Sequence, residues 1–164
     1  MMARARGGAT SAPLFALVAV ASFGAVIAAL VSQHAFGMDP CPWCTLQRLI
    51  FLAIGAFALL GLAWRGAAGS RVAAASALLL AACGFAAALW QQLVAARSGS
   101  CNLTLADRIM ATTQLDRLLP DVFEARASCA DAAVSLLGVP YAYWSAALFV
   151  VCAVALLRIL RLSA

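Results

Sequence analysis

The chain has 164 residues, of which 66% are hydrophobic and only 10% are charged, and its mean hydropathy is +1.01. A soluble domain of this size could not cover so much apolar surface, so these values exclude a soluble globular protein and indicate that lipid covers part of the chain. The net charge of +5 comes from arginines that flank the apolar stretches, so it is no argument for nucleic-acid binding.

Four apolar stretches are long enough to cross a hydrocarbon core about 30 Å thick, for which roughly 17–25 helical residues suffice. We expect membrane-spanning helices at about 13–32, 45–64, 72–95 and 141–160, connected by loops at 33–44 and 96–140. The pattern predicts an all-α membrane protein, with residues 1–164 forming a single four-helix bundle of up-down-up-down connectivity. Gly55, Gly61 and Gly84 are expected to let the helices approach closely.

The first apolar stretch follows Arg4 and Arg6 and runs unbroken to about Val31. A cleavable signal peptide also begins with basic residues, but its apolar region is typically about 7–15 residues long. We therefore expect a retained first helix, whereas cleavage would leave three spans and the same later charge pattern. His34, the only histidine, is interpreted as an interfacial residue and not as a proton donor or ligand.

The arginines are distributed unevenly about the four spans. One side carries basic residues without acidic ones, namely Arg4, Arg6, Arg65, Arg71, Arg158 and Arg161, whereas the other side mixes both signs. Since cytoplasmic loops are enriched in Lys and Arg, both termini and the turn at 65–71 are expected in the cytoplasm. The loops at 33–44 and 96–140 would then face outward.

Cys-Pro-Trp-Cys occupies residues 41–44, where the first outer loop ends and the second span begins. Thiols spaced C-x-x-C can close a small, reducible disulfide ring, and the positive end of a helix favours the thiolate that performs exchange. A redox-active pair at a bilayer surface suggests electron transfer between a water-soluble molecule and one dissolved in lipid.

Arg48 follows Cys44 by four residues, so on a helix it shares a face with Cys44 one turn deeper. A fixed cation there can stabilise a thiolate and also the anion formed when a lipid-soluble acceptor is reduced. The alternative is that Arg48 is an interfacial anchor that binds headgroups. Beside a redox pair we favour the stabilising role. We expect Arg48 to lie at the interface, with its guanidinium reaching toward water. Gln47 could add a hydrogen bond or could face the headgroups.

The loop at 96–140 is too short and too apolar to form a separate globular domain. Between Leu103 and Phe123 its apolar residues recur at near-helical intervals, interrupted by Pro120. This pattern predicts one or two short amphipathic helices on the membrane surface. The alternative is an irregular loop whose leucines pack on the top of the bundle.

The long loop also holds Cys101 and Cys129, whereas Cys83 and Cys152 fall inside spans and are interpreted as small apolar core residues. Three interpretations of the four outer cysteines stay open. Structural disulfides could brace the loop, but the Cys-Pro-Trp-Cys ring would add little constraint. A four-thiolate zinc site usually has two C-x-x-C pairs, and Cys101 and Cys129 do not supply the second pair. A redox relay by thiol–disulfide exchange accounts for all four positions together, and we favour it.

The segment Cys-Pro-Trp-Cys-Thr-Leu-Gln-Arg at 41–48 closely resembles the disulfide bond formation protein B (DsbB) family of bacterial inner-membrane quinone reductases. The four spans, the second cysteine pair and the segments LDRLLPDVFEARASC (115–129) and LLGVPYAYW (136–144) are similar to that family as well. The chain departs from it at Leu118 and Val134, where aromatic residues are expected, and at Gln91 and Gln92, which replace a clear histidine. Further quinone contacts at the end of span three are therefore not assigned.

The resemblance implies a quinone-dependent protein-disulfide oxidoreductase with four catalytic cysteines, Cys41, Cys44, Cys101 and Cys129. A periplasmic thiol oxidase of the DsbA type would attack the Cys101–Cys129 disulfide and form a mixed disulfide at Cys101. Cys129 would pass the electrons to Cys41–Cys44, and Cys44 would pass them to quinone, with ubiquinone preferred over menaquinone. Arg48 and Gln47 are the expected quinone-binding residues.

The implied location is the bacterial inner membrane, with the cysteines facing the periplasm, where the protein would sustain disulfide bond formation. One alternative is a variant that serves a single specialised DsbA-like partner. Another is a membrane scaffold with inert disulfides, in which cysteine substitutions would lower abundance but not activity per folded molecule. In an enzyme of the vitamin K epoxide reductase type, loop cysteines would precede the C-x-x-C, and here they follow it.

Overall fold

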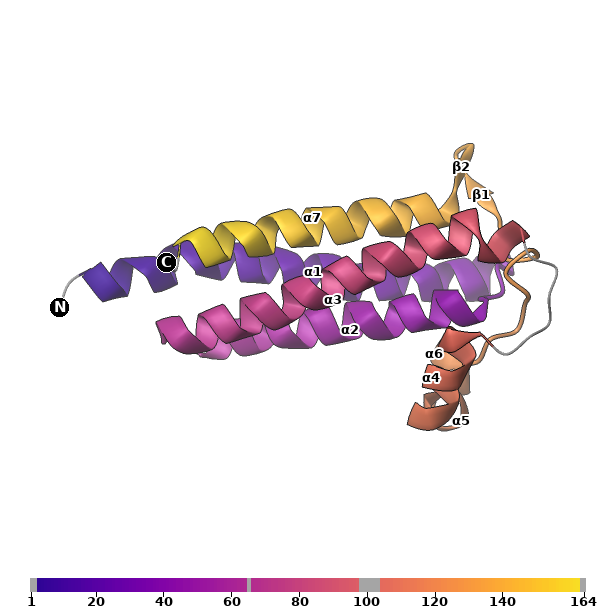
Figure 1. Ribbon diagram of the computed structural model, residues 1–164, viewed down its shortest axis with the longest axis horizontal. Coiled ribbons are helices and arrows are strands. Elements are labelled where there is room, and N and C mark those ends of the chain that lie inside the picture. The colour runs from indigo at the N-terminus through magenta and orange to yellow at the C-terminus, as the bar shows by residue number, and fades with distance from the viewer. Residues whose placement is uncertain (1–2, 65, 98–103, 163–164) are drawn as a thin grey trace.

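The computed structural model describes residues 3–64, 66–97 and 104–162, with side chains from Ser11 onward (Figure 1). Four long helices dominate it: α1 (Ala3–Phe36), α2 (Pro42–Ala63), α3 (Ala67–Leu93) and α7 (Tyr141–Leu162). They run side by side in alternating directions, so α1 begins and α7 ends at the same end of the bundle (Figure 1). All four are long and apolar enough to cross a membrane, which confirms the predicted all-α, four-span membrane fold.

Local sequence explains the helix ends near the cysteine pair. α1 extends to Phe36 and stops there because Gly37 adopts a φ of 63°, the left-handed conformation common just after a helix. α2 begins at Pro42, earlier than the expected residue 45, because proline suits the first helical position. Cys41 caps this helix, since its sulfur accepts a hydrogen bond from the Cys44 N–H.

Close packing of aromatic rings on glycines holds the helices together. The helices form a ring in the order α1, α2, α3, α7, and Phe51 of α2 stacks on Phe149 of α7 with ring centroids 4.0 Å apart. Rings cover the three expected glycines, with Phe23 on Gly55, Phe15 on Gly61 and Phe149 on Gly84. The expectation of close approach at these glycines is confirmed, because each ring fills the space that a side chain would take.

The two cysteines inside the spans have different surroundings. Cys152 is buried, with its sulfur 3.9 Å from the Ser22 hydroxyl oxygen, as expected for a core residue. Cys83 is exposed on the outer surface of α3, so the prediction that it belongs to the core is wrong. The sequence could not separate the two, because a helix that is apolar on every side does not mark its inner face.

The segment between α3 and α7 folds into short elements at the end of the bundle that carries Cys41. They are η1 (Ala95–Arg97), α4 (Leu105–Thr113), α5 (Leu115–Leu118), α6 (Pro120–Phe123), β1 (Ser135–Leu136) and β2 (Val139–Pro140). The short helices α4 and α6 lie beside the first turns of α2, α5 contacts α4 and α6, and the β1–β2 hairpin adjoins α7 (Figure 1). The helical interpretation of this segment is therefore correct, with three short helices in place of one or two.

Three of the four described leucines of α4, α5 and the residue that follows α5 are exposed, so they do not pack on the top of the bundle and that alternative is wrong. Leu118 is 71% exposed and Leu119 is 52% exposed, whereas Phe123 is buried. The hairpin was not predicted, because two-residue strands leave no alternating pattern. Its turn is formed by Leu137 and Gly138, which adopt φ angles of 55° and 78°, the conformation of a tight two-residue hairpin loop.

Candidate redox site

Cys41 and Cys44 lie at the first turn of α2, where the sequence placed them. Cys41 has an extended backbone, Pro42 follows as the first helical residue, and the Thr45 hydroxyl donates to the Pro42 carbonyl at 2.9 Å. This geometry brings the two sulfur atoms to 2.7 Å and directs the Cys44 N–H at the Cys41 sulfur, 3.4 Å away. The pair therefore lies at the positive end of a helix, in a geometry suited to reversible exchange.

A third sulfur completes the site, because Cys129 and Cys41 form a hydrogen bond. Cys41 thus lies between Cys129 and Cys44, and it is fully buried, whereas Cys129 is half-buried. Hydrogen bonds to Cys129 and Cys44, followed by burial, raise the pKa of the Cys41 thiol far above its ordinary 9.0. The hydrogen bond from Cys41 lowers the pKa of Cys129, against a smaller opposing effect of burial. Of these two sulfurs, Cys129 is the one that forms a thiolate more readily.

Backbone hydrogen bonds fix the Cys129 loop to the first outer loop. The N–H groups of Arg126 and Ala127 both donate to the Pro40 carbonyl, at 2.9 and 3.3 Å. Since Pro40 directly precedes Cys41, this contact attaches the two loops next to the cysteines that they carry.

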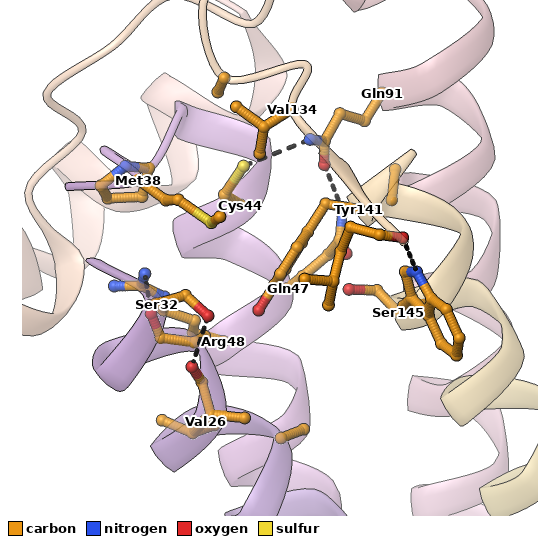
Figure 2. A pocket seen from close by; sticks show the side chains of 18 of the residues that line it. Val26, Ser32, Met38, Cys44, Gln47, Arg48, Gln91, Val134, Tyr141 and Ser145 are labelled. Carbon is orange, nitrogen blue, oxygen red and sulfur yellow. Dashed lines mark hydrogen bonds between the residues drawn. The ribbon is translucent and has the colours of Figure 1, made fainter. Parts of the chain in front are cut away.

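A cavity of about 250 Å³ opens beside Cys44, between the long helices (Figure 2). Its walls are mainly apolar and include Val26 from α1, Phe51 from α2 and Leu148 from α7. The polar residues that face it include Ser32, Asp39, Cys44, Gln47, Arg48, Gln91, Tyr141 and Ser145. An apolar pocket with a few convergent polar groups is typical of a small-molecule site.

Arg48 lies inside the bundle, with only 5% of its surface exposed. Its guanidinium donates hydrogen bonds to the side-chain oxygen of Gln33 (2.7 Å), the Val122 carbonyl (2.8 Å) and the Ala29 carbonyl (3.3 Å). The expectation that it reaches toward water is therefore wrong, because these three oxygens replace water as its partners. The expected common face with Cys44 is confirmed, since both residues line the cavity. No carboxylate of the described residues pairs with Arg48, so its charge acts directly on the cavity.

Gln47 and Gln91 form a pair of buried amides beside the Cys44 sulfur, as Figure 2 shows. The amide nitrogen of Gln47 donates to the side-chain oxygen of Gln91 at 2.6 Å, and the amide nitrogen of Gln91 donates to the Cys44 sulfur at 3.2 Å. The first hydrogen bond therefore orients the second amide with its N–H toward the sulfur. Gln47 faces the cavity and not the headgroups, and its hydrogen-bonded path to Cys44 runs through Gln91.

The structure brings five of the six predicted site residues together: Cys41, Cys44, Arg48, Gln47 and Cys129. The sixth, Cys101, lies outside the described residues. His34 is exposed at the end of α1, in keeping with an interfacial position.

Sequence reasoning assigned no role to three residues around the site, namely Gln33, Gln91 and Tyr141. Gln33 contacts Arg48, and Gln91 contacts Cys44. Tyr141 lines the cavity near Arg48. A glutamine at the end of an apolar span was a usable signal, because a buried amide needs a hydrogen-bond partner. The sequence did not identify that partner.

Comparisons with known proteins decide the family. The family described as Disulfide bond formation protein DsbB matches residues 11–159 of the chain. The chain belongs to the DsbB family. Disulfide bond formation protein B of Aromatoleum aromaticum is 38% identical over 120 residues, covering 71% of this chain and 72% of that protein. The protein of the same name from Ralstonia nicotianae is 32% identical over 157 residues, covering 90% and 92%.

A third relative, Disulfide bond formation protein B of Pseudomonas syringae pv. tomato, is 36% identical over 129 residues, covering 77% of this chain and 75% of that protein. The resemblance drawn from the segment at 41–48 is thus confirmed. The DsbB match includes α2 with its cysteine pair, the described loop with Cys129, and most of α1 and α7.

Proposed function

We propose that this DsbB-family protein reoxidises a periplasmic DsbA-type thiol oxidase and passes the electrons to membrane quinone. The observation that carries the proposal is the position of Cys41, which is buried between Cys129 and Cys44 while Cys44 faces an apolar cavity. One end of this row of sulfurs belongs to a loop and the other faces a pocket inside the bundle. Such a row supports electron transfer by thiol–disulfide exchange from a soluble dithiol to an apolar acceptor.

In this proposal electrons enter through a Cys101–Cys129 disulfide. A thiolate of the reduced partner attacks the Cys101 sulfur, the Cys101–Cys129 bond breaks, and Cys129 leaves as a thiolate. The contact with Cys41 places this thiolate next to the sulfur that it attacks in the next step. The second thiol of the partner then resolves the mixed disulfide, which releases the oxidised partner and the Cys101 thiolate.

Cys129 next attacks the Cys41 sulfur of a Cys41–Cys44 disulfide, so that the Cys129–Cys41 bond forms and Cys44 leaves as a thiolate. The hydrogen bond between Cys129 and Cys41 supports this order, because these two sulfurs are in contact. Attack by Cys101 on Cys129 restores the loop disulfide and leaves Cys41 as a thiol. The balance is two electrons moved from the partner dithiol to the Cys41–Cys44 pair; of the two protons that the dithiol loses, one ends on Cys41 and the other is released to water while Cys44 stays a thiolate.

The cavity beside Cys44 fits a quinone, which has a flat apolar ring with two carbonyl oxygens. Phe51 and Leu148 would contact the ring, and Arg48 would donate to a carbonyl. When bound, a quinone supplies an acceptor for two electrons and two protons. Arg48 stabilises the Cys44 thiolate and negative charge in the cavity, and Gln91 donates a further hydrogen bond to the Cys44 sulfur.

The arginine pattern supports an inner-membrane location with the cysteines facing the periplasm. Arg71 belongs to the first turns of α3, and Arg158 and Arg161 to the last turns of α7, so all three lie at the end of the bundle opposite Cys41 (Figure 1). This orientation lets a soluble periplasmic protein reach the loop that carries Cys129.

The proposal is tested by ubiquinone reduction with the purified protein and a reduced DsbA-type partner, followed as loss of quinone absorbance. We expect turnover by the unaltered protein and none by Cys44→Ser, which cannot form the disulfide with Cys41. Cys83→Ser is the matched control and should keep full activity, because Cys83 is exposed on the outer surface of α3. Full turnover by Cys44→Ser would refute the proposal, and the same assay with menaquinone tests the preference for ubiquinone.

A further inference from the structure

Gln33 of α1 and Arg48 of α2 contact each other inside the bundle and also contact α6. We propose that these two side chains form a latch that docks the second loop on the bundle and thereby brings Cys129 to Cys41. The inference rests on the proposed function, in which Cys129 must reach Cys41. It gives Gln33 a positioning role and Arg48 a second role besides the one in the cavity.

The latch consists of three hydrogen bonds that join α1, α2 and α6. The Arg48 guanidinium donates to the side-chain oxygen of Gln33 at 2.7 Å and to the Val122 carbonyl at 2.8 Å. The Gln33 amide nitrogen donates to the Asp121 carbonyl at 3.3 Å. Two consecutive carbonyls of α6 therefore accept hydrogen bonds from two side chains of the membrane helices.

The burial of the latch makes docking of α6 favourable. Gln33 is 4% exposed and Arg48 is 5% exposed, and N–H donors at such depth lose free energy when they have no partner. Undocking of α6 would remove the acceptors at Asp121 and Val122 and leave these donors unpaired until water entered. The acceptors are backbone carbonyls, so the contact does not depend on the identity of the loop side chains.

The docked segment leads directly to Cys129. The Phe123 side chain is buried next to the latch, and a few residues later the N–H groups of Arg126 and Ala127 bind the Pro40 carbonyl. The chain is thus attached at both ends of this stretch before it reaches Cys129. Releasing the inner attachment would free α6 and widen the range of positions available to the Cys129 sulfur.

Gln33 allows docking to be tested apart from the chemistry of the cavity. Arg48 lines the cavity beside Cys44, whereas Gln33 is not among the described residues that line it. A change at Gln33 therefore acts mainly on the attachment of the loop: it removes one of the acceptors of Arg48 but none of the contacts among Cys44, Gln47 and Gln91.

Two electron donors separate docking from the later chemistry. A DsbA-type partner needs the loop cysteines, whereas dithiothreitol can reduce the Cys41–Cys44 disulfide directly by attack on the half-buried Cys44. We expect Gln33→Leu to lower partner-driven ubiquinone reduction about ten-fold, because, of the two hydrogen bonds that it removes, the one to the Asp121 carbonyl holds α6 directly. The rate with dithiothreitol should fall much less, because Arg48 still lines the cavity and keeps its hydrogen bond to the Ala29 carbonyl. Gln92→Leu, a half-buried control at the end of α3, should change neither rate.

A second measurement does not involve quinone. In protein that carries Cys44→Ser and Cys101→Ser, mild oxidation joins Cys41 to Cys129, and the trapped fraction is read by gel mobility after alkylation. We expect Gln33→Leu to slow this trapping about ten-fold relative to its parent, by the same lost hydrogen bond. Unchanged trapping, or an equal loss of rate with both donors, would overturn the latch. Failure of the unaltered protein to reduce ubiquinone with either donor would overturn the proposed function and not the latch.

Discussion

The two ends of the bundle are made from the same four helices but are packed in opposite ways. Toward the end where α1 begins and α7 ends, apolar side chains pack closely against one another and against glycines, and the Phe15 ring, for example, covers Gly61. Toward the cysteine end, polar side chains are buried and bonded to one another, to Cys44 or to the second loop. They are Gln33, Gln47, Arg48 and Gln91.

The difference separates the part of the bundle that fixes the helices from the part that performs chemistry. Ring-on-glycine contacts hold the helix backbones at short distance, and the central Phe51–Phe149 stack continues them toward the cavity. With the helices held in this way, side chains at the other end can be aimed at one sulfur. Substitutions at the apolar end should therefore change stability, and substitutions at the polar end should change rates.

The largest expected effect is at Arg48, the cation of the polar end. Arg48→Ala should raise the ubiquinone concentration for half-maximal rate about 100-fold, the usual effect of losing one strong donor from a catalytic site. The rate is measured with dithiothreitol as donor, so that docking of the loop does not contribute. Arg48→Lys keeps the positive charge but loses the planar guanidinium, so its ubiquinone concentration for half-maximal rate should lie between those of the unaltered protein and Arg48→Ala. An unchanged quinone requirement in Arg48→Ala would contradict a role for this charge.

The next largest effect is expected at the apolar end, for Gly84→Ala. A methyl group at Gly84 would collide with the Phe149 ring, and such overpacking costs about 2 kcal/mol, or roughly 30-fold in the folding equilibrium. Gly24→Ala is the matched control, because nothing lies within 4 Å of a methyl group there. Unfolding in denaturing detergent measures both, and activity per folded molecule should stay the same. Equal stability of the two variants would contradict the packing argument.

A smaller effect is expected for the amide pair that orients a donor toward Cys44. Gln91→Leu removes the N–H that donates to the Cys44 sulfur and should slow its alkylation at neutral pH about ten-fold. Gln47→Glu should slow it too, because a carboxylate would accept the Gln91 N–H and turn the Gln91 oxygen toward the sulfur. Rates are read from modified peptides by mass spectrometry in the reduced protein. Faster alkylation in Gln47→Glu would show that the amide is oriented the other way.

The smallest effect is a difference in pH dependence between two neighbouring sulfurs. In the reduced protein, iodoacetamide labelling of Cys129 should level off below pH 9.0, because the hydrogen bond from Cys41 lowers the pKa of Cys129. Cys41 should stay largely unlabelled at that pH, because it is fully buried and hydrogen bonds to Cys129 and Cys44 raise its pKa. Mass spectrometry of the labelled peptides gives both profiles.

The sign of the corresponding stability terms follows from linkage. The lowered pKa of Cys129 contributes stability above its unfolded value of 9.0, and this is lost as the pH falls through the folded value. The raised pKa of Cys41 contributes stability below 9.0, and this is lost as the pH rises through the folded value. Cys41→Ala should move the labelling midpoint of Cys129 upward; an unmoved midpoint would contradict the hydrogen bond.

The fold could be predicted because its main signal is local. Long apolar stretches, of which the second contains only Arg48 as a charged residue, mark the four spans, and Pro42 marks the start of α2 within a few residues. The β1–β2 hairpin and the outward direction of Cys83 could not be predicted. The hairpin strands are too short to show alternation, and an all-apolar helix does not mark its inner face.

The site was predicted only as far as spacing along one helix allows. The interval from Cys44 to Arg48 correctly places both on one face, but it does not say what covers that face. Arg48 is covered by its hydrogen-bond partners Gln33 and the Val122 carbonyl, and Val122 lies far along the chain from Arg48. The contact between Cys129 and Cys41 is equally long-range. Partners of this kind depend on tertiary packing, so a single sequence does not reveal them.

The complete burial of Cys41 has a consequence for electron leakage. A bulky, charged thiol such as glutathione cannot reach the Cys41 sulfur, because no part of Cys41 is exposed. In the proposed relay, electrons reach Cys41 from Cys129, which belongs to the same polypeptide. Burial therefore prevents direct exchange of other thiols with Cys41, and it leaves the half-buried Cys44 and Cys129 as the described sulfurs of the site that such thiols can reach.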